Sequence, residues 1–231
     1  MEFREIVAPS IKELFVQQLE GMILSGHLRP GDKLPTEREL ADAMKVSKTV
    51  VHDGLRELHR LGFLDIVSRK GVTVADYAQT GSLDTLMAIM RYHGGLPDKK
   101  TAESILKLRY YLEGPAMELL AAHHTPADMA ALVDLQRQAE ESAQDTAAFA
   151  EALFRYHRGV TFLSGNTITP LIFNAFTQVN LEFWREYVDA YGTAACLDTL
   201  RRFTALIRER QGAEAAALLK NGLERFQQDR M

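Results

Sequence analysis

Basic side chains recur at four-residue intervals in the stretch VSKTVVHDGL and just beyond it. Lys48, His52 and Arg56 share one face if this stretch is helical, because a helix completes a turn in about 3.6 residues. A row of cationic side chains can bind the phosphate oxygens and base edges of DNA. The same row also suits an ordinary solvated helix face, with Asp53 and Glu57 as counter-charges. The spacing alone leaves both interpretations open.

Two polar residues of the C-terminal half lie on or near apolar helical stripes. His157 shares a stripe with Leu153 and Val160, so it is either a hydrogen-bonded core histidine or a polar group that lines a pocket. Arg109 lies near the edge of another stripe. There a guanidinium either binds a ligand carboxylate bidentately or extends to solvent.

Capping signals define the two helices around the basic row. Thr36 and Glu39 have the capping-box spacing, which begins a helix that runs to about Met44. Ser47 can cap a second helix over residues 48–61. Only three residues separate the two helices, and this arrangement predicts a helix-turn-helix. The basic row then lies on its second helix.

The remaining patterns predict a mainly α protein of two domains. A helix over residues 11–25 precedes the helix-turn-helix, and two β-rich runs around residues 68–71 predict the hairpin of a winged helix. We expect a winged helix-turn-helix domain over 1–75, a linker over 76–83, and an antiparallel bundle of six to seven helices over 84–231. The expected later helices are residues 82–93, 101–124, 126–142, 146–164, 169–191, 194–211 and 213–228.

Composition narrows the class of protein. The chain has 231 residues, 46% hydrophobic, with a net charge of −4. Residues 1–75 hold eleven basic and eleven acidic side chains, so any DNA affinity must come from a local patch. No apolar run reaches the length of about 18 residues needed for a membrane helix. The single cysteine, Cys196, cannot form an internal disulfide, and we expect the protein in the cytoplasm.

The stretch GHLRPGDKLPTERELADAMKVSKTVVHDGLRELHRLGFL closely resembles the DNA-binding signature of the GntR family of bacterial transcription regulators. The C-terminal half is similar to the FadR-like branch, which has an all-helical, FCD-type effector domain. LRYYLEGPAMELLAA resembles the R-x-x-x-E helix of that domain, with Arg109 and Glu113, and YHRGVTFLSGN resembles its F-H-x-x-[LIV]-x-x-x-S-G-N element.

The resemblance implies a set of site residues. The positions that match the family's DNA contacts, or lie one turn beyond them, are Arg38, Ser47, Lys48, Thr49, Val50, His52, Arg56, Lys70 and Gly71. The corresponding effector-binding positions are Arg109, His157 and Asn166. The family usually has arginine at the positions of Lys48 and His52. Lysine and histidine cannot form the bidentate arginine fork, so we expect an operator that differs from the common family site.

The resemblance also implies a metal site, but this sequence departs from it. Many FadR-like domains bind a divalent metal through one aspartate and three histidines. His157 matches one histidine, whereas the other three positions are Leu153 and, approximately, Leu200 and Gly222. A single imidazole does not hold a metal, so we expect no metal and no other cofactor. The apolar helix ITPLIFNAFTQVNLEFW suits an acyl ligand or simply the core of the bundle.

These observations together predict a bacterial transcription regulator. We expect a homodimer that binds a palindromic double-stranded DNA operator and responds to a small effector, a carboxylate or an acyl derivative. One alternative is an enzyme whose helical domain is catalytic and whose DNA-binding module is regulatory. Another is a DNA-binding dimer without an effector. The sequence has none of the common catalytic motifs, which argues against the enzyme.

Overall fold

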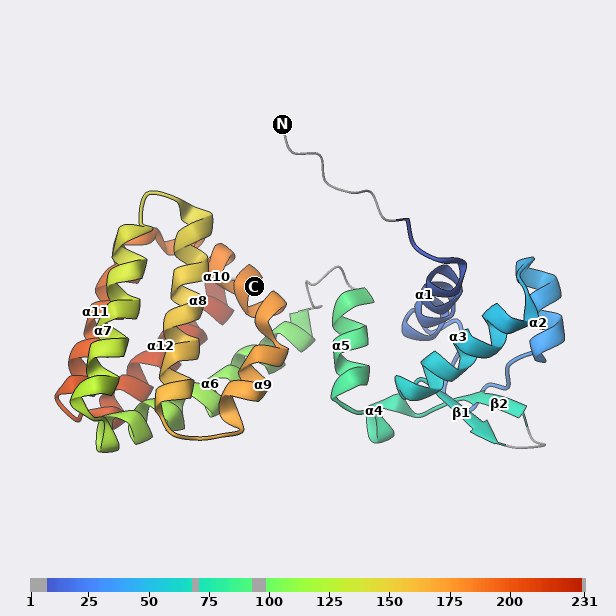
Figure 1. Ribbon diagram of the computed structural model, residues 1–231, viewed down its shortest axis with the longest axis horizontal. Coiled ribbons are helices and arrows are strands. Elements are labelled where there is room, and N and C mark those ends of the chain that lie inside the picture. Colours follow the sequence, from blue (N-terminus) through green and yellow to red (C-terminus); the bar gives the residue numbers. More distant parts are fainter. Residues whose placement is uncertain (1–7, 68–70, 93–98, 230–231) are drawn as a thin grey trace. The chain divides into compact units, whose positions relative to one another are not determined.

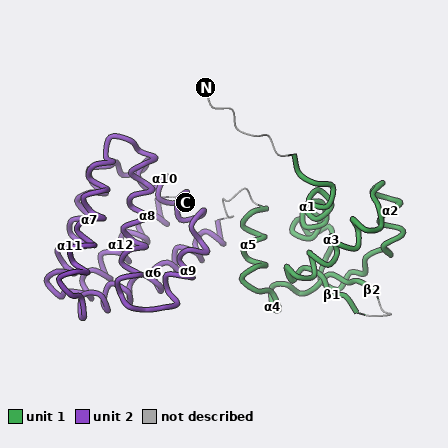
Figure 2. The backbone as a smooth tube through the Cα atoms, in the orientation of Figure 1, with its two compact units in different colours: residues 1–94 green, residues 95–231 purple. Residues whose placement is uncertain are grey.

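The computed structural model describes residues 8–67, 71–92 and 99–229 of the chain. The chain forms two compact units, residues 1–94 and residues 95–231 (Figure 2). Both units are mainly helical, as the sequence predicts. In the described part of the chain, no helix is both long enough and apolar enough to cross a membrane.

The first unit contains the predicted helix-turn-helix. The unit begins with α1 (Ile11–Leu24), and α2 (Glu37–Met44) and α3 (Lys48–Arg60) form the helix-turn-helix. Thr36 and Glu39 form the capping box of α2, and the Ser47 hydroxyl accepts a hydrogen bond from the backbone N–H of Val50. Lys45 ends α2 in the left-handed conformation, with φ of 56°, and turns the chain into α3. The capping signals therefore predicted these helix boundaries correctly.

A short hairpin follows α3 (Figure 1). β1 (Leu64–Val67) and β2 (Gly71–Val74) pair antiparallel, in the register that sets Leu64 opposite Val74. This confirms the predicted wing strands. Residues 68–70 between them lie outside the described residues, and Lys70, one of the expected DNA contacts, is among these.

Close packing of α1 on α3 builds the core of the first unit. Leu55 and Leu58 of α3 are buried, together with Phe15 and Leu19 of α1. A Cβ on Gly54 would lie 2.3 Å from the Phe15 ring. Glycine costs about 1 kcal/mol relative to alanine inside a helix. It is accommodated here because only glycine lets the ring approach α3 so closely.

The expected boundary between the domains differs from the structure. Residues 76–83 were expected to be a linker, but they contain α4 (Tyr77–Thr80). Residues 84–92 were expected to belong to the bundle, but α5 (Leu83–Tyr92) lies in the first unit and contacts α1. The reason is the apolar side of α5. Ala88 is fully buried in the core of the first unit, and Thr85 packs on Gly62.

The second unit is an all-helical bundle. Its described helices are α6 (Lys99–His123), α7 (Pro126–Glu141), α8 (Thr146–Leu163), α9 (Thr169–Ala175), α10 (Thr177–Tyr191), α11 (Thr193–Arg208) and α12 (Gly212–Asp229). The single helix expected over 169–191 is divided at Phe176, whose backbone leaves helical geometry at φ −98° and ψ 17°. Helix α6 packs along α12 and also contacts α8, so these helices surround the interior described below.

Candidate functional site

The N-terminal turn of α3 presents polar groups to solvent. Lys48 and Thr49 are exposed, and Ser47 is exposed while it caps the helix. Val50 is half-buried and packs against the core of the unit, so its side chain is only partly available. The start of a helix carries unpaired N–H groups and a partial positive charge, which together favour phosphate.

The second turn of α3 differs from a simple cationic row. His52 Nδ1 lies 2.9 Å from Oε1 of Glu37 on α2, and both side chains are about half exposed. Arg56 is exposed one turn further along. Arg38 on α2 is exposed and lies 4.0 Å from Asp42. Glu37 was not predicted as a site residue. Its partner, His52, is on another helix, and only the turn between α2 and α3 brings the two side chains together.

The turn before α2 brings one further cation against the wing. Gly71 is exposed at the start of β2, with φ of 102°. The side chain of Lys33 lies against it, since a Cβ on Gly71 would be 3.2 Å from Lys33 Cε. Lys33 pairs with Thr73 in an isolated β-bridge, which attaches the turn before α2 to the hairpin. Lys33 was not a sequence candidate. Its place in a Pro- and Gly-rich turn gave no signal of this pairing.

A buried polar cluster lies inside the second unit. It consists of Arg109 and Glu113 of α6 and His157 of α8, whose exposed fractions are 5%, 0% and 1%. Arg109 Nε donates to Oε1 of Glu113, and Oε2 of the same carboxylate lies 2.5 Å from His157 Nδ1. One carboxylate therefore links two helices. Because of the helical spacing, residues 109 and 113 meet on one face of α6.

Electrostatics fixes the charge states of this cluster. Burial alone would raise the pKa of Glu113, but the Arg109 charge, the charge that His157 carries once protonated, and the hydrogen bonds from both side chains outweigh it and lower the pKa to about 2. Burial lowers the pKa of His157, against the opposing effect of Glu113. The carboxylate is therefore ionised at neutral pH, and the imidazole is neutral and donates its Nδ1 proton to Glu113.

Trp184 of α10 covers the cluster. Arg109 Cζ lies 4.2 Å from the centre of the Trp184 ring, and the His157 ring centre lies 4.6 Å from it. This cation–π contact holds the guanidinium against the indole ring. Trp184 was not predicted as a site residue from the sequence. The only signal was its place in an apolar aromatic helix, which equally suits plain core.

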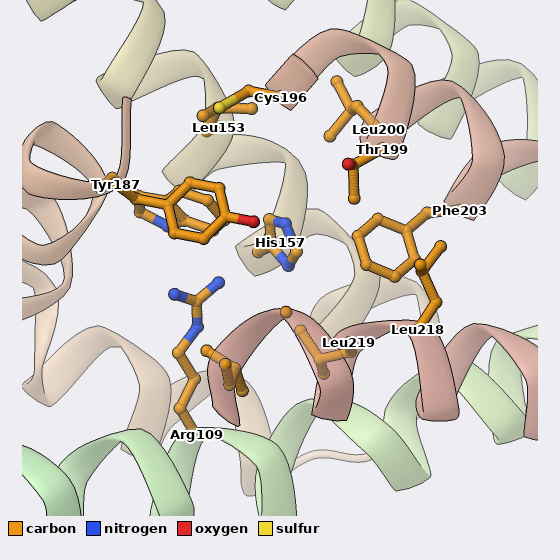
Figure 3. A pocket seen from close by; sticks show the side chains of 13 residues that line it. Arg109, Leu153, His157, Tyr187, Cys196, Thr199, Leu200, Phe203, Leu218 and Leu219 are labelled. Atoms are coloured by element: carbon orange, nitrogen blue, oxygen red, sulfur yellow. The ribbon is translucent and has the colours of Figure 1, made fainter. Parts of the chain in front are cut away.

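An interior cavity adjoins the cluster, with apolar walls from α8, α11 and α12 (Figure 3). Arg109 enters from α6, and its guanidinium points toward Tyr187 and His157. Leu200 and Leu219 are among the apolar residues of the wall. The cavity volume is about 30 Å³, which is room for roughly two water molecules. A larger ligand can therefore enter only if side chains of the wall move.

The four positions of the family's metal site all line this interior cavity. Leu153 and Leu200 offer no donor atom there, and Gly222 offers no side chain. His157 alone could bind a metal, and its Nδ1 already contacts Glu113. Among the described residues, no group of three or more His, Cys, Asp or Glu side chains could hold a metal ion. The residues present do not fit the metal site of the family.

The structure separates Asn166 from Arg109 and His157, with which it was grouped. Asn166 is exposed, and its side-chain oxygen accepts hydrogen bonds from the backbone N–H groups of Ile168 and Thr169 at 2.9 and 3.0 Å. It is not among the residues that line the interior cavity. Its amide instead holds the turn that begins α9, a common role for asparagine.

Family comparisons agree with this architecture. Residues 12–74 match the family described as "Bacterial regulatory proteins, gntR family", and residues 104–225 match the FCD domain. The second match alone covers more than half of the chain.

Among curated proteins, a fatty acid metabolism regulator protein of Klebsiella pneumoniae is 30% identical over 166 residues, 71% of this chain and 67% of that protein. The transcriptional regulator Mce2R of Mycobacterium tuberculosis is 27% identical over 176 residues, 76% of this chain and 72% of that protein.

A solved structure shows the same fold. Lar, which controls the expression of the Listeria monocytogenes agr system, has a TM-score of 0.59 at 14% identity over 96% of this chain and 97% of that chain. The chain therefore belongs to the gntR family of bacterial regulatory proteins and carries an FCD domain, so it is a transcriptional regulator and not an enzyme.

Proposed function

We propose that this regulator binds a palindromic operator as a homodimer, with α3 of each protomer in the major groove of one half-site. The observation that carries this proposal is the exposed N-terminal turn of α3. Ser47 caps the helix, and Lys48 and Thr49 are its first two residues and are exposed. Phosphate and base edges are the natural partners of such a turn. A two-fold symmetric dimer presents two such helices, so its operator has two-fold symmetry as well. The protein acts in the cytoplasm, where bacterial DNA lies.

The other polar residues have supporting roles in this proposal. Arg56, which is exposed on α3, and Arg38 and Gly71, which are exposed on the neighbouring α2 and wing, contact the DNA backbone. Glu37 orients the His52 ring through its contact with Nδ1, which leaves Nε2 for the groove. Since Lys48 and His52 form single hydrogen bonds where arginine forms two, base discrimination is less sharp at these positions.

The interior cavity is the proposed effector site, and its ligand is a small organic acid or a derivative of one. Arg109 is the polar anchor, and the apolar walls receive the rest of the molecule. The cavity is too small for such a molecule without adjustment, so binding must displace side chains of α11 and α12. We propose that this displacement also shifts the helices themselves, and that the shift changes the affinity for DNA. We propose that no metal takes part, because three of the four family positions lack donor atoms.

A genomic selection tests the DNA-binding part of the proposal. Purified protein is incubated with sheared DNA of its own organism, and the retained fragments are sequenced. A shared palindrome, bound by two chains as measured by the mass of the complex, supports the proposal. Retained fragments without a common sequence, or one chain on each fragment, would rule out the dimer on a palindrome.

A thermal-shift screen with organic acids, their esters and amides, and divalent metals tests the effector part. Stabilisation by a small molecule, with a matching change in operator affinity, supports a sensor. Stabilisation by metals alone would contradict the metal-free site. If nothing stabilises the protein, the second unit serves dimerisation and not sensing.

A further inference from the structure

The interior cavity has a balanced electric charge. Among the described residues that line it, Arg109 alone carries a formal charge. That charge is already compensated, because Glu113 is ionised and accepts the Nε hydrogen bond of the same guanidinium. His157 is neutral for the reason given above. Counted together with Glu113, which lies behind it and does not itself line the cavity, Arg109 therefore offers no excess positive charge to an anion.

Arg109 nevertheless has an unused hydrogen-bond donor. Its Nη2 is buried and has no hydrogen-bond partner among the described residues. The side chain is 95% buried, and its guanidinium points into the interior cavity (Figure 3). Trp184, which also lines the cavity, has an unpaired buried Nε1–H as well. Buried donors in folded proteins nearly always have a partner. A ligand in the cavity that carries a hydrogen-bond acceptor would therefore pair one of these two buried donors.

We infer that the interior cavity selects the uncharged carbonyl of an amide, ester or similar acyl derivative over the carboxylate of the parent acid. The carbonyl oxygen accepts from Arg109 Nη2, and the apolar body of the ligand lies along Leu200 and Leu219. This inference rests on the proposed function, since it takes the interior cavity to be the effector site.

The balance between the two ligand classes follows from desolvation. A carboxylate would lose its hydration on entering, and it would meet an arginine whose charge Glu113 already shares. A neutral carbonyl has a much smaller hydration to lose, and it can still accept the same hydrogen bond. A metal-bound site would reverse this preference, because the metal supplies uncompensated positive charge. The residues present do not fit such a metal site.

The test compares matched pairs of ligands on the full-length, chelator-treated protein. Butanoate is paired with butanamide, and hexanoate with hexanamide. Binding is followed by the fluorescence of Trp184, the chain's one tryptophan, whose ring contacts Arg109. We expect each amide to bind about tenfold more tightly than its acid, or better. Tighter binding of the acids would overturn the inference and leave the effector site standing. If neither class binds, the proposed effector site fails together with the inference.

Two variants of the cluster test the physical cause. In Glu113→Gln, Arg109 loses its counter-charge, so the preference should reverse and the acids should bind about tenfold more tightly than the amides. Arg109→Lys keeps an ion pair with Glu113, but one nitrogen cannot also occupy the Nη2 position. Amide binding should then fall about tenfold. Arg137→Lys, at an exposed arginine of α7, is the matched control and should change neither preference.

The outcome is decisive even if Glu113→Gln does not fold, because Arg109→Lys keeps the charge balance of the cluster. Circular dichroism establishes that each variant is folded before its binding is measured. An unchanged acid-to-amide ratio in a folded Glu113→Gln would refute the charge argument. Unchanged amide affinity in a folded Arg109→Lys would refute the role of Nη2.

Discussion

Replacing Glu113 with glutamine tests whether the buried polar cluster stabilises the second unit. The substitution keeps the shape of the side chain and removes its charge, which leaves the buried Arg109 uncompensated. The pKa of Glu113 is lowered from 4.5 to about 2, and a shift of that size corresponds to about 3 kcal/mol of stability at neutral pH. Breaking one partner of a buried ion pair typically costs about 3–5 kcal/mol, so the two figures agree.

The pH dependence gives this prediction its sign. The pKa of Glu113 is lower in the folded protein, so its contribution is fully present above about pH 4.5 and is lost as pH falls toward 2. The difference in free energy of unfolding between wild type and Glu113→Gln should therefore shrink from about 3 kcal/mol at pH 7 to roughly half of that or less at pH 3.

Urea unfolding followed by Trp184 fluorescence measures this difference, since the one tryptophan reports on the second unit. Glu118→Gln is the control. Glu118 is an exposed glutamate on the same helix, so its substitution should change stability by less than about 0.5 kcal/mol. If Glu113→Gln were as stable as wild type at neutral pH, or if the difference did not depend on pH, the ion pair would not hold the cluster as described.

Three further substitutions have expected outcomes. Gly54→Ala should destabilise the first unit by about 1–2 kcal/mol, although alanine has the higher helix propensity, because the alanine Cβ would lie 2.3 Å from the Phe15 ring. A melting temperature above that of wild type, measured by circular dichroism, would contradict this contact. Gly222→Ala should stabilise the second unit by up to about 1 kcal/mol, because alanine has the higher helix propensity and its Cβ would meet only the Tyr187 hydroxyl, at 3.6 Å. A urea midpoint below that of wild type would show that the space beside Gly222 is not open. His52→Ala should change stability by less than about 1 kcal/mol, because its contact with a carboxylate is half exposed; a larger loss in the same melting experiment would mean that this contact holds α2 on α3.

Local signals predicted much of the first unit correctly. Thr36 and Ser47 cap the expected helices because capping depends on residues three positions apart, which the sequence displays directly. The boundary of the unit was not predictable in the same way. Helix α5 has an ordinary helical pattern, and only its tertiary contact with α1 assigns it to the first unit.

The interior cavity was predictable in its location but not in its charge. The sequence pattern placed His157 on an inward stripe, and the family's metal positions led to the residues that line the cavity. The charge state depends on the contact between Glu113 and His157, which lie 44 positions apart on different helices. Asn166 was grouped with the pocket from the motif alone. In the structure its side-chain oxygen accepts hydrogen bonds from the backbone N–H groups of Ile168 and Thr169, and the motif gave no sign of this.

The most direct test of DNA reading by α3 is the affinity of wild type and Lys48→Ala for the selected operator and for a scrambled duplex, measured by fluorescence anisotropy at the same salt concentration. Lys12→Ala, at an exposed lysine of α1, is the control and should bind like wild type. If Lys48 reads a base, its loss should weaken operator binding by about 1–3 kcal/mol, which is roughly 5- to 150-fold, and should weaken scrambled DNA much less. Equal losses on both duplexes would assign Lys48 to a phosphate. Unchanged operator affinity would contradict the claim that the start of α3 reads the DNA.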